Sequence, residues 1–243
     1  MARTLAWVAG GGLSVGVVCL SLAYAIGGNE LRHMADFDLP FGGSCGKEGE
    51  AKSERRLAWN GGDTINIALP ATVRYRGGEG SEVIVRGSSG VVDRVDLQGH
   101  SLTLNCRGFA RAHDIEVILP GRTFRRINLT GSGTVIMENV SQSELAVSIS
   151  GSGDIRAQGK VDNVKVSIAG SGHARLADLA TRQLTVKIAG SGNVEAAPTD
   201  LADIRLTGSG NVRLLTRPAQ LRSHISGMGR ITQASLDSAE GRK

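Results

Sequence analysis

The residues of this chain that could do chemistry stand at fixed points of a repeat. A serine lies between two glycines in triplets that begin at residues 131, 151, 170, 190 and 208, and a sixth copy reads Gly227-Met228-Gly229. The serines are Ser132, Ser152, Ser171, Ser191 and Ser209. A serine becomes a nucleophile when an adjacent base activates it, and neither histidine nor an acid recurs beside the triplets. We therefore expect these serines to hydrogen-bond with one another or with the backbone.

Acidic residues offer two other kinds of chemistry, calcium binding and glycan hydrolysis. The position after each triplet reads Thr134, Asp154, His173, Asn193, Asn211 and Arg230. Calcium-binding repeats carry an aspartate in every turn, so this position predicts no metal site. A glycoside hydrolase needs two carboxylates facing one cleft, but the acids do not recur in register: Asp154, Asp162, Asp178, Glu195, Asp200 and Asp203. The sequence indicates no catalytic residue and no cofactor, with a carbohydrate-active enzyme as an alternative.

A row of arginines is the remaining candidate site. The position two residues further along reads Ile136, Arg156, Arg175, Glu195, Arg213 and Thr232. If the repeats stack as strands, Arg156 and Arg175 lie about 4.8 Å apart, with Arg213 two repeats further on. Guanidinium groups engage carboxylates and phosphates in bidentate fashion, so Arg156, Arg175 and Arg213 form a candidate stripe for an anionic ligand. The alternative is an ordinary solvated face on which Glu195 pairs with its neighbours.

The elements that carry these residues are short strands between tight corners. Apolar residues alternate on both sides of each triplet, as at Val147 and Ile149 before one triplet and Ile155 after it, which is the pattern of half-buried strands. Successive triplets lie 18 to 20 residues apart, a spacing typical of solenoid repeats. The corner glycines are Gly131, Gly133, Gly151, Gly153, Gly170, Gly172, Gly190, Gly192, Gly208 and Gly210. We predict an all-β fold, a right-handed parallel β-helix with about 19 residues per coil, each coil a triangular rung of three short strands.

The part of the chain before the triplets is less regular. Strands are predicted at residues 64 to 68, 71 to 75, 82 to 86, 102 to 106 and 114 to 119, with turns between them, one of them at residues 88 to 90. Because terminal repeats of a solenoid are usually atypical, we interpret this part as about three irregular coils that close one end of the solenoid.

The two ends of the chain are predicted to lie outside the solenoid. Residues 1–29 are expected to be a signal peptide, cleaved after Ala25, or an uncleaved membrane anchor. Residues 30–56 read as a polar, charged linker, 57–235 as the solenoid, and 236–243 as a polar tail that caps the open end of a monomer. Cys45 and Cys106 are the two cysteines beyond the first segment, and either they form a disulfide or Cys106 is a core residue.

A resemblance to a known family rests on two features. The strand Ile115-Glu116-Val117-Ile118-Leu119-Pro120 ends the irregular part, and the serial Gly-Ser-Gly coils follow it. Together they resemble the putative auto-transporter adhesin head GIN domain family over about residues 57 to 235. The resemblance implies a bacterial cell-envelope β-solenoid, and it supplies no catalytic residue.

The sequence therefore predicts a non-catalytic, exported cell-envelope module for binding or adhesion, in the periplasm or at the cell surface. A structural spacer is the alternative, besides the enzyme named above. The expected partner is an anionic envelope glycan or another envelope protein. The net charge of +5 is mild and no basic run alternates with aromatic residues, so nucleic acid is not expected as a partner. The membrane is expected to be a partner only through the N-terminal segment.

Overall fold

The computed structural model describes residues 51–60, 62–76, 80–105, 115–121 and 123–234. The predicted signal peptide or anchor, most of the predicted linker, both Cys45 and Cys106, residue 235 and the predicted tail at 236–243 lie outside the described residues. Among the residues described, no helix is both long and apolar enough to cross a membrane.

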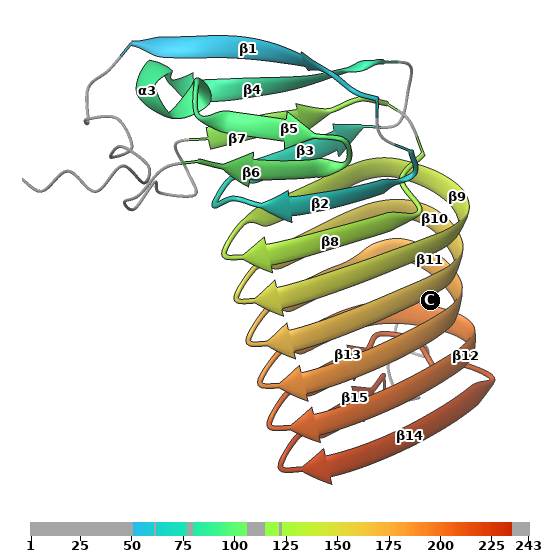
Figure 1. Cartoon of the computed structure of the whole chain (residues 1–243). Coiled ribbons are helices and arrows are strands. Elements are labelled where there is room, and N and C mark those ends of the chain that lie inside the picture. The colour runs from blue at the N-terminus through green and yellow to red at the C-terminus, as the bar shows by residue number, and fades with distance from the viewer. Residues whose placement is uncertain (1–50, 61, 77–79, 106–114, 122, 235–243) are drawn as a thin grey trace, which may run out of the picture. The chain divides into compact units, whose positions relative to one another are not determined.

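The second half of the described chain is a stack of parallel coils, as predicted (Figure 1). Strands β8 (Arg126–Gly131), β9 (Thr134–Gly151), β10 (Asp154–Gly170), β11 (His173–Gly190) and β12 (Asn193–Gly208) pair in parallel in this order. Strands β13 (Asn211–Leu214), β14 (Gln220–Gly227) and β15 (Arg230–Gln233) complete the last turns, where β13 and β14 both pair with β12, and β15 pairs with β13. The chain winds in a right-handed sense as it advances (Figure 1).

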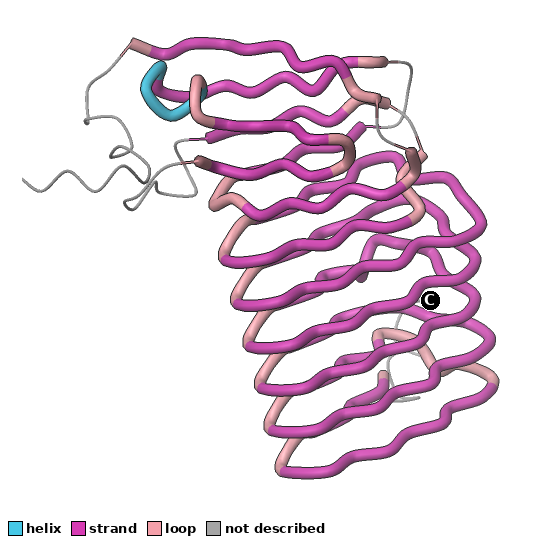
Figure 2. The backbone as a smooth tube through the Cα atoms, in the orientation of Figure 1, coloured by secondary structure: helices cyan, strands magenta, loops and turns pink. Residues whose placement is uncertain are grey.

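Each coil is one long bent strand, which differs from the predicted rung of three short strands. Strands β9 to β12 contain 16 to 18 residues each. Figure 2 shows that these coils leave strand conformation mainly at the corner that the triplets form. The remaining bends are register shifts, as between Ala157 and Gly159, where the ladder of hydrogen bonds resumes after an irregular residue.

The two glycines of a triplet are required for different reasons. Gly151 has φ +119°, in the left-handed region that residues with a Cβ rarely adopt, and a Cβ here would lie 2.8 Å from the carbonyl oxygen of Gly131. Gly153 has no such φ, but its Cβ would lie 2.5 Å from Cδ2 of Leu129 in the preceding coil. The first glycine of the triplet is thus required mainly for its backbone angles, and the second because neighbouring coils approach closely.

The triplet serines do not form the expected row of side-chain hydrogen bonds. Their side chains are exposed, and no hydrogen bond joins one to the next in the described chain. The backbone makes the contact instead, since the N–H of Ser152 donates to the carbonyl of Gly131 at 3.0 Å and that of Asp154 to the carbonyl of Gly133 at 3.0 Å. The ladder of backbone hydrogen bonds therefore passes through the corner without using the hydroxyl.

The core of the coils is built from aliphatic columns that run along the axis. Inward residues at equivalent positions stack on one another and are buried: Leu145, Val164, Leu184 and Ala202; Val147, Val166, Val186 and Ile204; Ile149, Ile168, Ile188 and Leu206; Val135, Ile155, Ala174, Val194 and Val212. The alternation of the sequence places their neighbours outward. These outward columns carry every candidate site.

The N-terminal part is a cap that is only partly solenoid, which corrects the prediction of three irregular coils. Strands β2 (Thr64–Ala68) and β3 (Thr72–Arg76) pair in parallel with β8 and β9 and so form one further turn. Strand β6 (Ser101–Leu104) pairs in parallel with β2, and β7 (Ile115–Leu119) with β3. Beyond them the pairing becomes antiparallel, because β4 (Glu82–Ser88) lies between β7 and β1 (Lys52–Ala58), and β5 (Val95–Gln98) forms a hairpin with β6.

Two local predictions also need correction in this cap. The first strand starts at Lys52, so residues 52 to 56, which were expected to belong to the linker, pair with β4. Their charges alternate with less exposed positions, which is compatible with an edge strand. The turn predicted at residues 88 to 90 is the start of a short helix, α3 (Ser89–Val92), which buries Val91 and Val92.

Candidate functional site

The arginines of the predicted stripe lie on one face of the solenoid, on the first half of each coil. We call this the first face; it comprises the outward residues of β3, β7, the first halves of β9 to β12, β13 and β15. The register places Arg156 beside Arg175, and Glu195 between Arg175 and Arg213. The neighbours predicted from the repeat are therefore the neighbours in the structure.

Acids of the same face are within reach of most of these arginines. Nη1 of Arg175 lies 3.5 Å from Oδ1 of Asp154, and Nη1 of Arg213 lies 3.5 Å from Oε1 of Glu195. Arg156 has no ion pair with any residue that the structure describes. The cap continues the pattern on this face, since Arg74 pairs with Glu116 at 2.9 Å and Arg76 with Glu138 at 2.8 Å. The positive charge of the first face is thus largely balanced within the protein.

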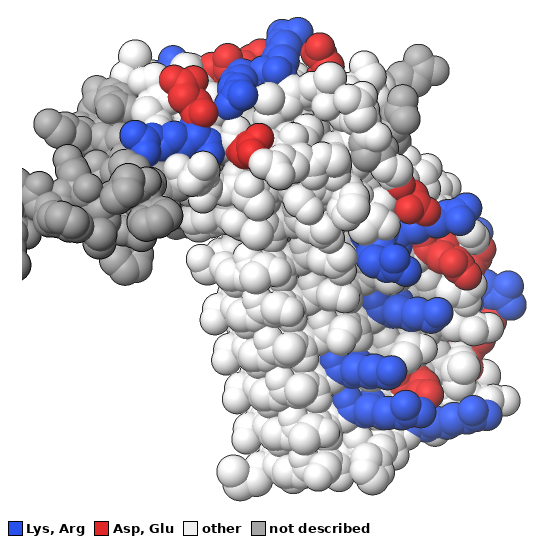
Figure 3. Space-filling view, viewed as in Figure 1, with Lys and Arg blue, Asp and Glu red and all other residues white. Residues whose placement is uncertain are grey.

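The opposite side of the coils carries a second set of cations. We call it the basic face; it comprises the outward residues of β8, the second halves of β9 to β12, and β14. Its basic residues are Arg126, Lys165, Lys187, Arg205 and Arg222, and all five are exposed. The register places Arg126, Lys165 and Arg222 in one column and Lys187 and Arg205 in the adjacent column. Figure 3 shows these basic side chains following one another down the coils.

Few acids balance the charge of the basic face. Its acidic residues are Glu144 and Asp203, and Asp203 pairs with Arg205 at 3.8 Å. The remaining basic residues of this face make no ion pair with any described residue: Arg126, Lys165, Lys187 and Arg222. Neighbouring like charges on a sheet repel each other. A bound anion would therefore reduce the repulsion among the basic side chains of this face.

Small side chains lie beside the cations and make the surface flat. The column nearest the corners contains Thr130, Ser150, Ala169, Ala189, Thr207 and Ser226, and the next column contains Asn128, Ser148 and Ser167 ahead of Lys187 and Arg205. Figure 3 shows this part of the face as a smooth uncharged area. A long ligand can lie across such a surface and contact the cations with its charged groups.

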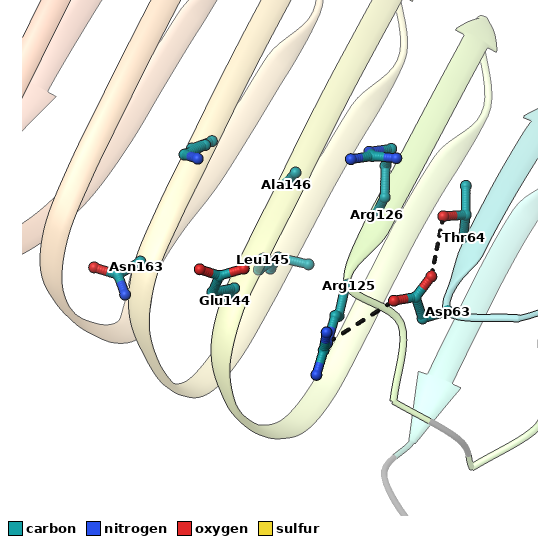
Figure 4. Close-up of a pocket in the computed structure, with 9 residues that line it drawn as sticks. Asp63, Thr64, Arg125, Arg126, Glu144, Leu145, Ala146 and Asn163 are labelled. Carbon is teal, nitrogen blue, oxygen red and sulfur yellow. Dashed lines mark hydrogen bonds and ion pairs between the residues drawn. The ribbon is translucent and has the colours of Figure 1, made fainter.

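One coil has no cation in either of the two columns of the basic face, and a cavity lies there. Ala146 stands between Arg126 on β8 and Lys165 on β10. Its short side chain leaves a space of about 270 Å³, which we call the notch (Figure 4). Asp63, Glu144 and Asn163 also line the notch and bring oxygen and amide groups to it.

The sequence contains a pattern for the basic face that is not visible at any single position counted from the triplets. A lysine or arginine precedes the triplet by five residues at Arg126, Lys165 and Arg222, and by three residues at Lys187 and Arg205. Both offsets point outward on the same strand, because side chains two residues apart share a face. Only the coil that ends at Gly151 has no basic residue at either offset, and this is the coil of the notch.

Metal binding finds no geometric support in the described residues, among which no group of three or more histidine, cysteine or acidic side chains could hold an ion. His173 shares a column with Asp154 and Asn193, and its Nδ1 lies 3.1 Å from Nδ2 of Asn193. Nδ2 of Asn211 in turn donates to Oδ1 of Asn193 at 3.0 Å. The position after the triplet is therefore a row of amide contacts in these coils.

The fold and the two faces define a class: a right-handed parallel β-solenoid with a capped N-terminal end. The chain belongs to the family described as "Putative auto-transporter adhesin, head GIN domain", whose model matches residues 63–218. The family resemblance noted in the sequence is thereby confirmed.

Solved structures have the same fold. A putative adhesin from Bacteroides fragilis superposes with a TM-score of 0.60 at 14% identity, over 76% of this chain and 98% of that chain. A putative lipid binding protein from Parabacteroides distasonis superposes with a TM-score of 0.50 at 17% identity, over 77% of this chain and 98% of that chain. At these identities the likeness concerns the fold. No curated protein matches the sequence.

Proposed function

We propose that this protein is a non-catalytic, exported module of the bacterial cell envelope that binds an anionic polymer on its basic face. One observation carries the proposal: Arg126, Lys165, Lys187 and Arg222 are exposed on one flat face and have no acid partner among the described residues. Cations that follow one another along the coils suit a polymer that carries several carboxylates or phosphates.

The arrangement of acids favours binding over catalysis. Glu144 and Asp203 are the acids of the basic face, and they belong to strands β9 and β12, three strand spacings or roughly 14 Å apart along the axis. Carboxylate pairs of glycoside hydrolases lie about 5 to 9.5 Å apart. Asp203 is moreover occupied by Arg205. Asp63 also lies near Glu144, but its carboxylate pairs with Arg125 at 3.9 Å and accepts a hydrogen bond from Thr64 at 3.3 Å. Each acid that could act with Glu144 is therefore either distant or already paired with an arginine.

Export and adhesion are supported by the family and by the N-terminal sequence. The family and the Bacteroides fragilis protein are both described as putative adhesins. The apolar segment at residues 1–29 is typical of exported proteins. We therefore place the solenoid in the periplasm or at the cell surface, with an acidic glycan of the envelope as its ligand.

Binding to polygalacturonate, with neutral dextran as the comparison polymer, tests the proposal. We expect the K165A/K187A double variant to bind about tenfold more weakly, which corresponds to roughly 0.7 kcal/mol for each cation, and we expect binding to weaken with salt. R156A/R175A is the matched control, since it removes two arginines from the first face, and it should bind within about twofold of the parent.

Biolayer interferometry at about 50 and about 300 mM salt, roughly threefold below and twofold above physiological ionic strength, measures both variants against the parent. Equal binding by all three proteins would overturn the proposal. Loss in R156A/R175A alone would move the site to the predicted arginine stripe.

A further inference from the structure

The notch differs from the rest of the basic face in that it is concave. Arg126 and Lys165 lie on either side of Ala146 and, two strand spacings apart, leave about 10 Å between their backbones. Arg126 and Lys165 flank a hollow of about 270 Å³, which Arg125 also lines. Pockets for drug-sized ligands occupy about 300 to 1,000 Å³, so the notch has room for one compact group.

Hydrogen bonds hold the rim of the notch in place. The carbonyl of Asp63 accepts from the backbone N–H groups of Arg125 at 2.8 Å and Arg126 at 3.1 Å, and its Oδ1 accepts from the hydroxyl of Thr64 at 3.3 Å. The N–H of Ala146 donates to the carbonyl of Arg125 at 2.8 Å. Figure 4 shows Asp63 linked to both Thr64 and Arg125. A rim fixed in this way loses little freedom when a ligand binds.

The opposite rim is fixed by a glutamine. Nε2 of Gln142 donates to the carbonyl of Glu144 at 2.6 Å and to that of Phe124 at 2.9 Å, which ties the start of the second half of β9 to the loop before β8. The carboxylate of Glu144 makes no ion pair with any described residue. Its oxygens are free to accept hydrogen bonds.

The notch therefore combines two chemistries. Arg126 and Lys165 bind an anionic group, while Asp63, Glu144 and Asn163 accept hydrogen bonds from hydroxyls. Arg125 also lines the notch and pairs with Asp63 at 3.9 Å. A bare anion would gain from Arg126 and Lys165 but would be repelled by the carboxylate of Glu144. A neutral sugar would gain from the acceptors but would leave both cations without an anion. One ligand class satisfies both sets, a sugar ring that bears a single carboxylate.

We propose that the notch is a subsite for one uronate residue, and this inference rests on the proposed function, because it makes the notch the place where one sugar of the acidic polymer is recognised. The remaining cations of the basic face then contact neighbouring residues of the polymer. The notch supplies the selectivity for an acidic sugar, and the flat part of the face supplies charge.

Titration of the ¹⁵N-labelled chain with galacturonate, galactose and inorganic phosphate tests the inference by NMR. We expect galacturonate to shift the amide signals of residues around Ala146, and galactose and phosphate to bind at least about tenfold more weakly, as expected for the loss of one paired charge or of several hydroxyl contacts. The A146L variant fills the notch without changing a charge, and the outward position of Ala146 allows the longer side chain. It should lose galacturonate binding, and R126A should lose it as well.

K187A is the matched control, since Lys187 is exposed on the same face but does not line the notch. It should bind galacturonate like the parent. Equal galacturonate binding by A146L and the parent would overturn the subsite, and so would phosphate binding as tight as galacturonate binding. If galacturonate leaves the notch signals unchanged while polygalacturonate still binds, the subsite fails and the proposed function stands. If galacturonate binds the notch but polygalacturonate binds K187A/R222A, which leaves the notch intact, as tightly as the parent, the subsite stands and the proposed function fails.

Discussion

The coils and the cap bury their apolar residues in two different ways. From Arg126 to the end of the chain there is no aromatic residue, and the coils are filled by columns of valine, isoleucine, leucine and alanine. The cap is organised around Phe124, whose ring lies 5.4 Å from that of Trp59 and 5.7 Å from that of Tyr75, both in edge-to-face geometry. Repeated aliphatic columns fill the interior of the coils, whereas three aromatic rings fill the interior of the cap.

This difference follows from what each part must do. Identical backbones stack at one spacing, so each inward column can use side chains of one size, and the corners must admit the next coil. At the end of the stack no further coil follows, and the antiparallel strands leave an irregular space. Large flat rings fill such a space, and their edge-to-face contacts add to the area that they bury.

The two ends of the solenoid are also protected differently. The outer strand of the cap, β1, carries Lys52, Glu54, Arg55 and Arg56, and charged edge strands resist pairing with other chains. The last coil, by contrast, contains the two large apolar side chains that are exposed among the described residues, Ile225 at 41% and Met228 at 88%. Met228 replaces the serine of the triplet, so the repeat pattern changes in the last coil that the structure describes.

The largest loss of stability is expected when a corner glycine is replaced. Val at position 151 would meet both the left-handed φ and the carbonyl of Gly131, neither of which can adjust without moving two coils. We expect G151V to lower the free energy of unfolding by about 4 to 6 kcal/mol. Thermal and urea-induced unfolding, followed by circular dichroism, measures the loss.

Two control variants separate the coil geometry from the residue type. S152A should cost less than about 1 kcal/mol, because the Ser152 hydroxyl is exposed and makes no hydrogen bond with described residues. G99A in the cap, where φ is +58° and nothing lies within 4 Å of the Cβ position, should cost only about 1 to 2 kcal/mol. A G151V protein as stable as S152A would show that the corner tolerates a side chain.

The arrangement of the coils was predictable from the sequence, whereas in the cap the strands were predictable but their pairing was not. A repeated corner imposes its spacing on every residue between two triplets, so the inward columns at Val147 and Ile149 could be predicted from one coil and extended to the next. The second bend of the coil is different, because it uses Asn139 with φ 56° in one coil and Gly159 with φ 129° in the next. No residue type recurs there, and the sequence alone suggested short separate strands.

The pairing of the cap strands escaped prediction because it is nonlocal. Strand β7 pairs with both β3 and β4, in parallel with one and antiparallel to the other, although its own sequence shows only alternation. The same limit applied to the site. The repeat predicted that Arg156 and Arg175 would be neighbours, but it did not reveal that Asp154 reaches Arg175, nor that cations at two different offsets would gather on the opposite face.

The second prediction compares large and small apolar residues in the two parts. Phe124 is fully buried between two other rings, so F124A should lower the free energy of unfolding by about 3 to 4 kcal/mol through the cavity that it leaves. I188V in a coil removes one methylene from an aliphatic column and should cost about 1 kcal/mol. Chemical denaturation of both variants tests the contrast, and an F124A protein that loses no more than I188V would mean that the rings do not hold the cap.

The smallest effect concerns the outer strand of the cap and depends on pH. Oε2 of Glu54 lies 2.9 Å from Nε of Arg86 on β4, and Oε1 lies 3.1 Å from Nε of Arg56. The hydrogen bonds from Arg86 and then from Arg56 hold the pKa of Glu54 below its ordinary value of 4.5. A carboxylate with a lowered pKa stabilises the folded state above the ordinary pKa, and this contribution is lost as the pH falls through the lowered value.

Strand β1 should therefore stay closed from neutral pH down to about 5 and loosen below the ordinary pKa of Glu54. In the coils a response in a similar range is expected around Asp200, where hydrogen bonds from Thr199 and then Arg182 also lower the pKa. Because the side chains are exposed, we expect only about a threefold loss of amide protection in β1. Hydrogen exchange at pH 5 and pH 3, corrected for the intrinsic rate, measures this loss of protection.

E54Q should already show the loosened β1 at pH 5 and little further change at pH 3. D200N, which removes the carboxylate that pairs with Arg182 at 2.9 Å in the coils, should leave the pH response of β1 intact. A β1 strand whose protection in the parent does not change between the two pH values would show that Glu54 does not fasten the cap.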